Sequence, residues 1–258
     1  MEKLNYYYLL TTSYLTALLI WWVVQKTLKG IWDKTLAVKF QRPWLEVALV
    51  MLAAVATVLI GQLYSSKFLL PPFKLGVIRV SECFNQLLIF SPFVFYMIVR
   101  KQGLATGWLS REKAGARFLA GVMLGAVAIG VFVMLSRQRN YFTVLADVFH
   151  VRNVHYAVQI FIEDLAIALL LARLSDALGR KGFIYAVLVV AFLFSIGHLP
   201  AKLEDGVPLV QGLVDVLLDM ALVALVALFL YRSKDILWFF PIHFAMDMMQ
   251  FYSGVELN

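Results

Sequence analysis

Eight apolar runs, each close to the length that crosses a lipid bilayer, restrict the fold of this chain more than any other feature. A helix needs about 20 apolar residues to span the hydrocarbon core. None of the runs alternates with a period of two, and inside lipid only helices and closed barrels satisfy their own backbone hydrogen bonds. We therefore predict an all-α fold, a polytopic membrane helical bundle of about eight transmembrane helices. The runs fall at 8–27, 43–63, 80–99, 116–135, 154–172, 182–199, 210–231 and 235–252.

The composition is that of an integral membrane protein. Hydrophobic residues make up 62% of the 258 residues and charged residues only 15%, whereas soluble domains carry roughly 25% charged residues. Because the runs cover the whole length, residues 1–258 are predicted to form a single transmembrane domain. The net charge of +7 lies mainly in short connections, so we expect membrane lipid as a partner and no nucleic acid.

The distribution of Lys and Arg predicts how the chain lies in the membrane. These residues are more numerous in the connections that follow the first, third, fifth and seventh runs than in the others. The positive-inside rule then places both termini outside the cytoplasm, in what we expect to be a bacterial cell membrane. Aromatic residues near the ends of the runs are interpreted as interfacial belts, among them Tyr6, Tyr7, Tyr8, Trp21, Trp22 and Trp238.

Two adjacent carboxylates, Glu163 and Asp164, lie in the middle of the fifth run. Ionisable groups at that depth are costly and usually functional. Glu163 continues a stripe that begins with His155 and Gln159, because residues four apart share a helical face. Asp164 is rotated by about 100° and must face a neighbouring helix or a cavity wall. We interpret this pair as the centre of a buried functional site.

Later runs carry further buried polar residues. His198 ends the sixth run, four residues after Phe194. In the eighth run His243 and Asp247 are four residues apart, so the carboxylate is able to orient the imidazole ring for acid–base chemistry. The seventh run contributes Asp215 and Asp219 at the same spacing, either as cavity-lining or packing groups or as members of the same site; the sequence leaves their role open.

Three ordered motifs resemble the CPBP family of intramembrane proteases, which includes the CAAX prenyl endopeptidases and relatives in bacteriocin processing and immunity. They are Glu163–Asp164, Phe194-x-x-x-His198 and His243-x-x-x-Asp247, and they define a catalytic-motif core over residues 154–252. The chain departs from the family pattern E-E-x-x-x-R in two places. Asp164 stands at the second acid, and Ala168 stands where the family has arginine; Arg173, five residues further on, is interpreted as an anchor at the inner face.

The resemblance implies an intramembrane endopeptidase that hydrolyses a bond in a membrane-associated peptide or protein, for example a lipidated or leader peptide. Glu163 with His198 is then expected to activate water, and His243 with Asp247 to line the oxyanion side. Asp164 is expected to shape the site or to position the water. Glu163, His198 and His243 are also candidate ligands for a divalent metal such as zinc, and metal-free glutamate catalysis is the alternative.

Two other functions remain as hypotheses. The arginine missing at Ala168 fits a catalytically weak or inactive family member that acts as a membrane immunity or binding protein. A small-solute or proton-coupled transporter is the third hypothesis, with Glu163, Asp219 and the histidines acting as a relay. The transporter hypothesis lacks the inverted repeat and the paired broken helices that are common in such proteins.

Overall fold

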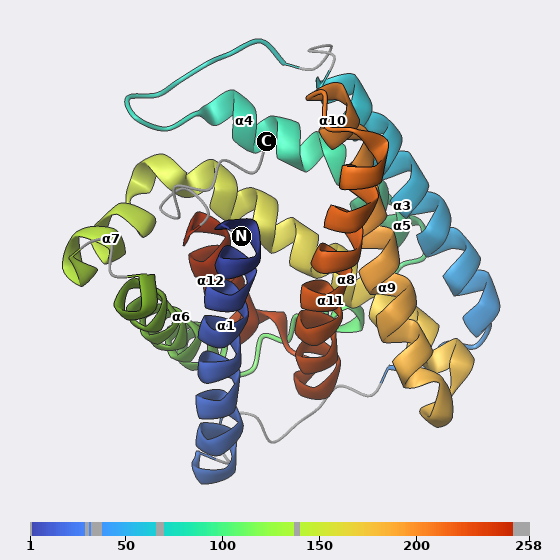
Figure 1. The fold of residues 1–258 in the computed structure, drawn as a ribbon. Helices are drawn as coiled ribbons and strands as arrows, with labels where there is room; N and C mark the ends of the chain where they lie inside the picture. Colours follow the sequence, from blue (N-terminus) through green and yellow to red (C-terminus); the bar gives the residue numbers. More distant parts are fainter. Residues whose placement is uncertain (1, 29–30, 32–37, 66–69, 137–139, 250–258) are drawn as a thin grey trace.

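The computed structural model describes residues 2–28, 31, 38–65, 70–136 and 140–249 (Figure 1). These residues are mostly helical and include no strand, apart from an isolated bridge between Leu75 and Ile78. The all-α prediction is therefore confirmed. The helices are α1 (Glu2–Thr27), α3 (Pro43–Ser65), α4 (Val80–Ile89), α5 (Ser91–Val99), η1 (Leu104–Gly107), α6 (Ala114–Ser136), α7 (Tyr141–Val148), η2 (Val151–Asn153), α8 (Val154–Leu178), η3 (Arg180–Gly182), α9 (Phe183–Gly197), α10 (Leu199–Glu204), α11 (Leu209–Ser233) and α12 (Ile236–Met249).

The structure supports a polytopic membrane bundle and leaves the number of spans open. Five helical segments among the described residues are long and apolar enough to cross a bilayer, and a sixth is obtained if α4 and α5, bent by 52° at their junction, form one broken span. α12 is apolar but spans only 14 residues as described, and the end of its predicted run lies outside the described residues. The count of eight therefore stays a prediction.

Helix α8 lies at the centre of the bundle. It contacts α3, α4, α9 and α12, and in Figure 1 it crosses behind α1 and α11. Every residue from Ile162 to Leu174 is buried. Because α8 is surrounded by protein rather than lipid, it is able to carry carboxylates at a depth where a lipid-facing helix would not tolerate them.

Helices α6 and α12 approach each other closely through glycines of α6. A Cβ atom added at Gly121 would collide with the backbone carbonyl of Trp238, and one added at Gly125 would lie 2.9 Å from the carbonyl oxygen of Pro241. Small residues of this kind allow helix backbones to pack in direct contact inside a membrane. This contact fixes the position of α12, which carries His243 and Asp247.

Arg173 anchors α8 from inside the protein and not at a lipid-facing surface. Its side chain is fully buried; Nε donates to the Tyr96 hydroxyl at 2.9 Å and Nη1 donates to the Thr106 carbonyl at 2.7 Å. Tyr96 in turn donates to Glu46 at 2.5 Å, and Glu46 also pairs with Arg100 at 2.6 Å. The buried guanidinium is compensated through this network, which ties α8 to α3 and α5.

The interfacial assignment of the aromatic residues is wrong for several of them. Trp21 and Trp238 stack in the core with ring centroids 4.2 Å apart, and their exposed fractions are 2% and 0%. Tyr6 and Tyr7 are also buried, whereas Tyr8 is 64% exposed. Position near the end of an apolar run does not distinguish a ring that faces lipid headgroups from one that faces a neighbouring helix.

Candidate active site

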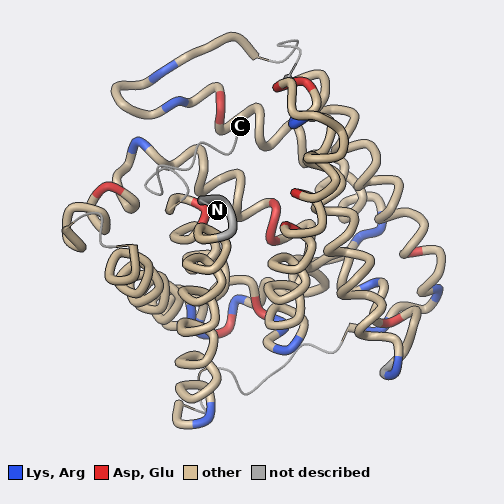
Figure 2. Tube along the Cα trace, in the orientation of Figure 1, with Lys and Arg blue, Asp and Glu red and all other residues tan. Residues whose placement is uncertain are grey.

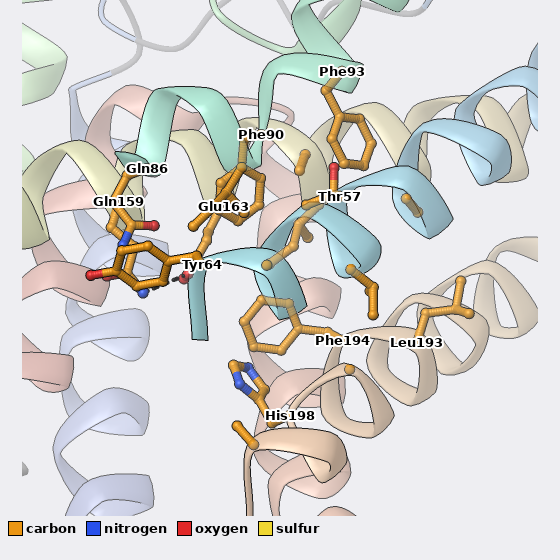
Figure 3. A pocket seen from close by; sticks show the side chains of 18 of the residues that line it. Thr57, Tyr64, Gln86, Phe90, Phe93, Gln159, Glu163, Leu193, Phe194 and His198 are labelled. Atoms are coloured by element: carbon orange, nitrogen blue, oxygen red, sulfur yellow. Dashed lines mark hydrogen bonds between the residues drawn. The ribbon is translucent and has the colours of Figure 1, made fainter. Parts of the chain in front are cut away.

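A cavity of about 540 Å³, here called the larger cavity, lies between α3, α4, α8 and α9. The predicted stripe of His155, Gln159 and Glu163 on α8 lines it. Gln159 Nε2 donates a hydrogen bond to Glu163 Oε1 at 2.9 Å, which fixes one carboxylate oxygen. In Figure 3, Gln159 lies beside Tyr64 and Gln86, while Phe90, Phe93 and Leu193 form an apolar part of the wall. The larger cavity therefore joins polar and apolar surfaces at Glu163.

A second cavity of about 390 Å³, here called the smaller cavity, lies between α1, α8, α10, α11 and α12. Four of the five predicted site residues line it: Glu163, His198, His243 and Asp247. Glu163 and His198 line both cavities, and Figure 3 shows them projecting from different walls. The fold thus brings Glu163 and Asp247, which are 84 positions apart in the sequence, to the wall of one cavity.

His198 lies where α9 ends and α10 begins. The Phe194 ring, one turn earlier on α9, packs edge-on against the imidazole with ring centroids 4.9 Å apart (Figure 3). Pro200 stands in the first turn of α10, where its missing N–H is tolerated. The spacing Phe194-x-x-x-His198 therefore has a physical function, because the phenylalanine limits the orientations that the histidine ring adopts.

Asp164 does not line either cavity and instead supports His243 from behind. Its Oδ1 atom lies 2.8 Å from His243 Nδ1, and its side chain is fully buried. The other ring nitrogen, Nε2, lies 3.7 Å from Asp247 Oδ1 within α12. The adjacent carboxylates of α8 therefore have separate surroundings: Glu163 faces the cavities, and Asp164 holds the imidazole of α12.

The candidate metal ligands do not form a metal site in this structure. Among the described residues, no three His, Cys, Asp or Glu side chains are grouped closely enough to hold a metal ion. His243 Nδ1 is already bound to Asp164, and Glu163 accepts from Gln159. A zinc site built from Glu163, His198 and His243 is not supported, and no reaction step is derived through a metal.

Within the part of the chain that the structure describes, Arg173 does not substitute for the arginine that the family pattern has at the position of Ala168. Ala168 is fully buried on α8. Arg173 is occupied by Tyr96, Gln102 and Thr106, ten residues beyond Glu163, which corresponds to about 15 Å along a helix axis. The acidic pair is therefore contacted by His243, which binds Asp164, and by Gln159, which donates to Glu163, rather than by a guanidinium.

The sequence did not identify Lys202, Tyr7 and Tyr14 as part of this region. Lys202 lies one helical turn after His198, and this spacing was a usable signal. The two tyrosines come from α1, more than 140 residues before Glu163. Nothing in the local sequence indicated that α1 lies against the smaller cavity.

The fold and site define a class of protein: a polytopic helical membrane protein with glutamate, aspartate and histidine side chains that line cavities between its helices. Residues 154–249 match the family model of type II CAAX prenyl endopeptidase Rce1-like proteins. This match agrees with the resemblance of the three motifs to the CPBP family of intramembrane proteases. No curated protein and no solved structure matches the chain.

Proposed function

We propose that the protein is an intramembrane endopeptidase that cuts a membrane-associated peptide by metal-free hydrolysis. The family supports a CAAX-type protease activity in general. The observation that carries the specific proposal is that Glu163, His198, His243 and Asp247, from three separate helical segments, line one cavity while the fifth residue, Asp164, binds His243. Peptide hydrolysis needs a base and a donor to the oxyanion, and this group contains both.

In the proposed mechanism Glu163 takes a proton from a water molecule that His198 helps to position. The resulting hydroxide attacks the peptide carbonyl, and the proton passes from Glu163 to the leaving amine as the carbon–nitrogen bond breaks. Gln159 holds Oε1 of Glu163, so the other oxygen is available for the water. Burial of Glu163 and His243 within the bundle strengthens their electrostatic contacts.

His243 is the proposed donor to the oxyanion. A ring that donates through Nδ1 to Asp164 and through Nε2 to the oxyanion is a protonated imidazolium. The carboxylates of Asp164 and Asp247 lie on its two sides, at 2.8 Å and 3.7 Å, and supply the compensating negative charge. Asp247, as a carboxylate, is unable to donate to an oxyanion itself.

Cleavage is expected to be insensitive to metal removal. The purified full chain in proteoliposomes is incubated with a farnesylated CAAX peptide and with an unmodified apolar peptide, and products are identified by mass spectrometry. Addition of EDTA or 1,10-phenanthroline should leave the rate within about twofold, because no step uses a metal. Loss of activity that zinc restores would contradict the metal-free mechanism, and absence of any product would contradict the peptidase.

We also propose that the site opens on the non-cytoplasmic side of a bacterial cell membrane. In Figure 2 more of the Lys and Arg residues lie in the lower half of the bundle, whereas α10, which follows His198, lies near the top (Figure 1). Basic residues favour the cytoplasmic side. This orientation favours an exported or membrane-embedded peptide as substrate.

Cysteine labelling in intact cells tests the orientation. With Cys83 replaced by Ser, a membrane-impermeant maleimide is expected to label Val151→Cys, just before α8, and not Glu112→Cys, just before α6. Both positions are exposed, and neither change removes a basic residue. Labelling of both variants after permeabilisation is the control. Labelling of Glu112→Cys alone in intact cells would reverse the orientation.

A non-proteolytic membrane binding or immunity protein is the second candidate function. The observation that favours it is the buried Ala168 at the family's arginine position, with Arg173 committed elsewhere. In that case the polar site would persist for binding while hydrolysis would be slow. The two candidate functions predict different results for Glu163→Gln: a protease would lose its biological activity, whereas a binding or immunity protein would keep it.

A further inference from the structure

Part of the smaller cavity is not used by the proposed mechanism. This part of the wall is formed by Tyr6, Tyr7 and Tyr14 of α1 together with Asp219 of α11 and Lys202 of α10. This wall is continuous with the reaction residues, because His243 and Asp247 line the same cavity. A substrate bound for cleavage would therefore have atoms in contact with it.

The wall already holds one ammonium group, which belongs to the protein. Lys202 Nζ lies 2.9 Å from Asp219 Oδ2 and 3.9 Å from Asp215 Oδ2. The Tyr7 hydroxyl donates to the other oxygen of Asp219. A tyrosine-supported carboxylate at this distance shows that the cavity stabilises a cation of lysine type.

Carboxylates outnumber basic side chains in this cavity. Besides Glu163, Asp215 and Asp219, the lining includes Asp205 and Asp247. Among the described lining residues, Lys202 is the only lysine, and there is no arginine. The side chain of Asp247 is 38% exposed, and its contact with His243 is 3.7 Å, longer than a hydrogen bond. The cavity therefore has five carboxylates against Lys202 and a protonated His243, which leaves negative charge that these two groups do not neutralise.

Two buried tyrosines add an independent indication that this space receives a polar group. Tyr6 and Tyr14 are 5% and 2% exposed and line the cavity, and within the described part of the chain neither hydroxyl has a hydrogen-bond partner. Buried tyrosine hydroxyls normally find one. A ligand with hydrogen-bond donors would satisfy them, and a cation next to tyrosine rings and a carboxylate gains further attraction.

We propose that this wall of the smaller cavity binds a lysine or arginine side chain of the peptide substrate. That the bound side chain belongs to a peptide follows from the proposed function, and this inference rests on it. Glu163 and His198 line both cavities, so a peptide that crosses between the cavities would pass the reaction centre. The expected substrate has a basic residue on one side of the cut bond and an apolar segment, in the larger cavity, on the other.

Binding measurements on the full-length Glu163→Gln variant in phosphatidylcholine nanodiscs test the proposal without cleavage. The probes are fluorescent palmitoylated tripeptide amides whose middle residue is lysine, glutamine or glutamate. The lysine probe is expected to bind about tenfold more tightly than the glutamine probe, with the glutamate probe weakest. A second substitution, Asp219→Asn, should remove most of the lysine preference.

Two variants keep this test decisive. Lys202→Met removes the internal competitor and should increase the lysine preference above that of the parent variant. Asp147→Asn changes a partly exposed carboxylate that lines neither cavity and should leave the preference unchanged. Equal binding of the lysine and glutamine probes, or a lysine preference that survives both Asp219→Asn and Asp215→Asn in folded protein, would overturn the proposal. Displacement of the lysine probe by equimolar zinc would also overturn it, because it would show a metal site instead.

The experiments distinguish an error in the proposed peptidase function from an error in the proposed cation site. Cleavage of the same probes by the unmodified chain is measured in parallel. A lysine preference in binding without any cleavage would support the cation site and count against the peptidase. Cleavage with equal rates for the lysine and glutamine probes would support the peptidase and exclude the cation site.

Discussion

Replacement of Glu163 by Gln is expected to lower kcat for peptide cleavage by about a thousandfold, with KM nearly unchanged. Glutamine keeps the size of the side chain, and its carbonyl oxygen is still able to accept the hydrogen bond from Gln159. It is unable to take a proton from water. The variant therefore separates the loss of the base from loss of shape or binding, and initial rates in proteoliposomes measure it.

Glu82→Gln is the matched control for this prediction. Glu82 also lines the larger cavity and also has a hydrogen-bonded partner, the Tyr64 hydroxyl, but it does not belong to the group around the smaller cavity. Its kcat is expected to stay within about threefold of the unmodified protein. If Glu163→Gln retained full biological activity, hydrolysis would not be the function, and the membrane binding or immunity protein would be favoured.

Asp164→Asn is expected to lower kcat by about a hundredfold while KM changes little. The asparagine has nearly the same shape, so the packing of α8 against α12 should persist. It lacks the negative charge that balances a protonated His243, and loss of one oxyanion donor costs about 10²–10³ in kcat. Asp164 acts through His243 as a positioning residue, since its side chain is fully buried behind the ring and lines neither cavity.

To test this role of Asp164, kcat and KM are measured separately for Asp164→Asn and for the conservative variant Asp164→Glu. Glutamate restores the charge and is the residue of the family pattern, so it should recover more activity than asparagine. Asp147→Asn is the control, because Asp147 is a partly exposed carboxylate of α7 paired with Arg152. Equal activities of the asparagine and glutamate variants would show that the carboxylate charge is not required, and His243 would lose its assigned role.

The helical class and the positions of most helices could be predicted from the sequence. Apolar runs of bilayer length leave few alternatives, because unpaired backbone groups are costly in lipid. The number of spans could not be predicted in the same way. The bend of 52° between α4 and α5 lies inside a single apolar run, and α8 is enclosed by other helices instead of facing lipid. Hydropathy measures the affinity of a segment for an apolar environment and does not distinguish lipid from protein.

The site shows the same division between local and tertiary information. Helical spacing predicted that His155, Gln159 and Glu163 share one face of a helix, and in the structure all three line the larger cavity. It did not show which carboxylate orients His243. The sequence favoured Asp247, four residues away on the same helix, whereas Asp164, on another helix, makes the 2.8 Å contact and Asp247 lies at 3.7 Å. Contacts within a helix follow from its period, but contacts between helices depend on rotation and depth.

The sequence by itself determined that the chain is a helical membrane protein and that its fifth, sixth and eighth runs carry ionisable residues. The cost of exposing polar groups to hydrocarbon marks such residues as candidates, whereas their grouping into one site was implied by the resemblance to the CPBP family. Only the tertiary structure placed Asp164 behind His243, separated Arg173 from the acidic pair and brought the tyrosines of α1 to the wall beside Lys202. These contacts depend on how the helices pack against one another. For example, glycines of α6 allow the backbone of α12 to approach closely. Packing of this kind brings together residues that are distant in the sequence.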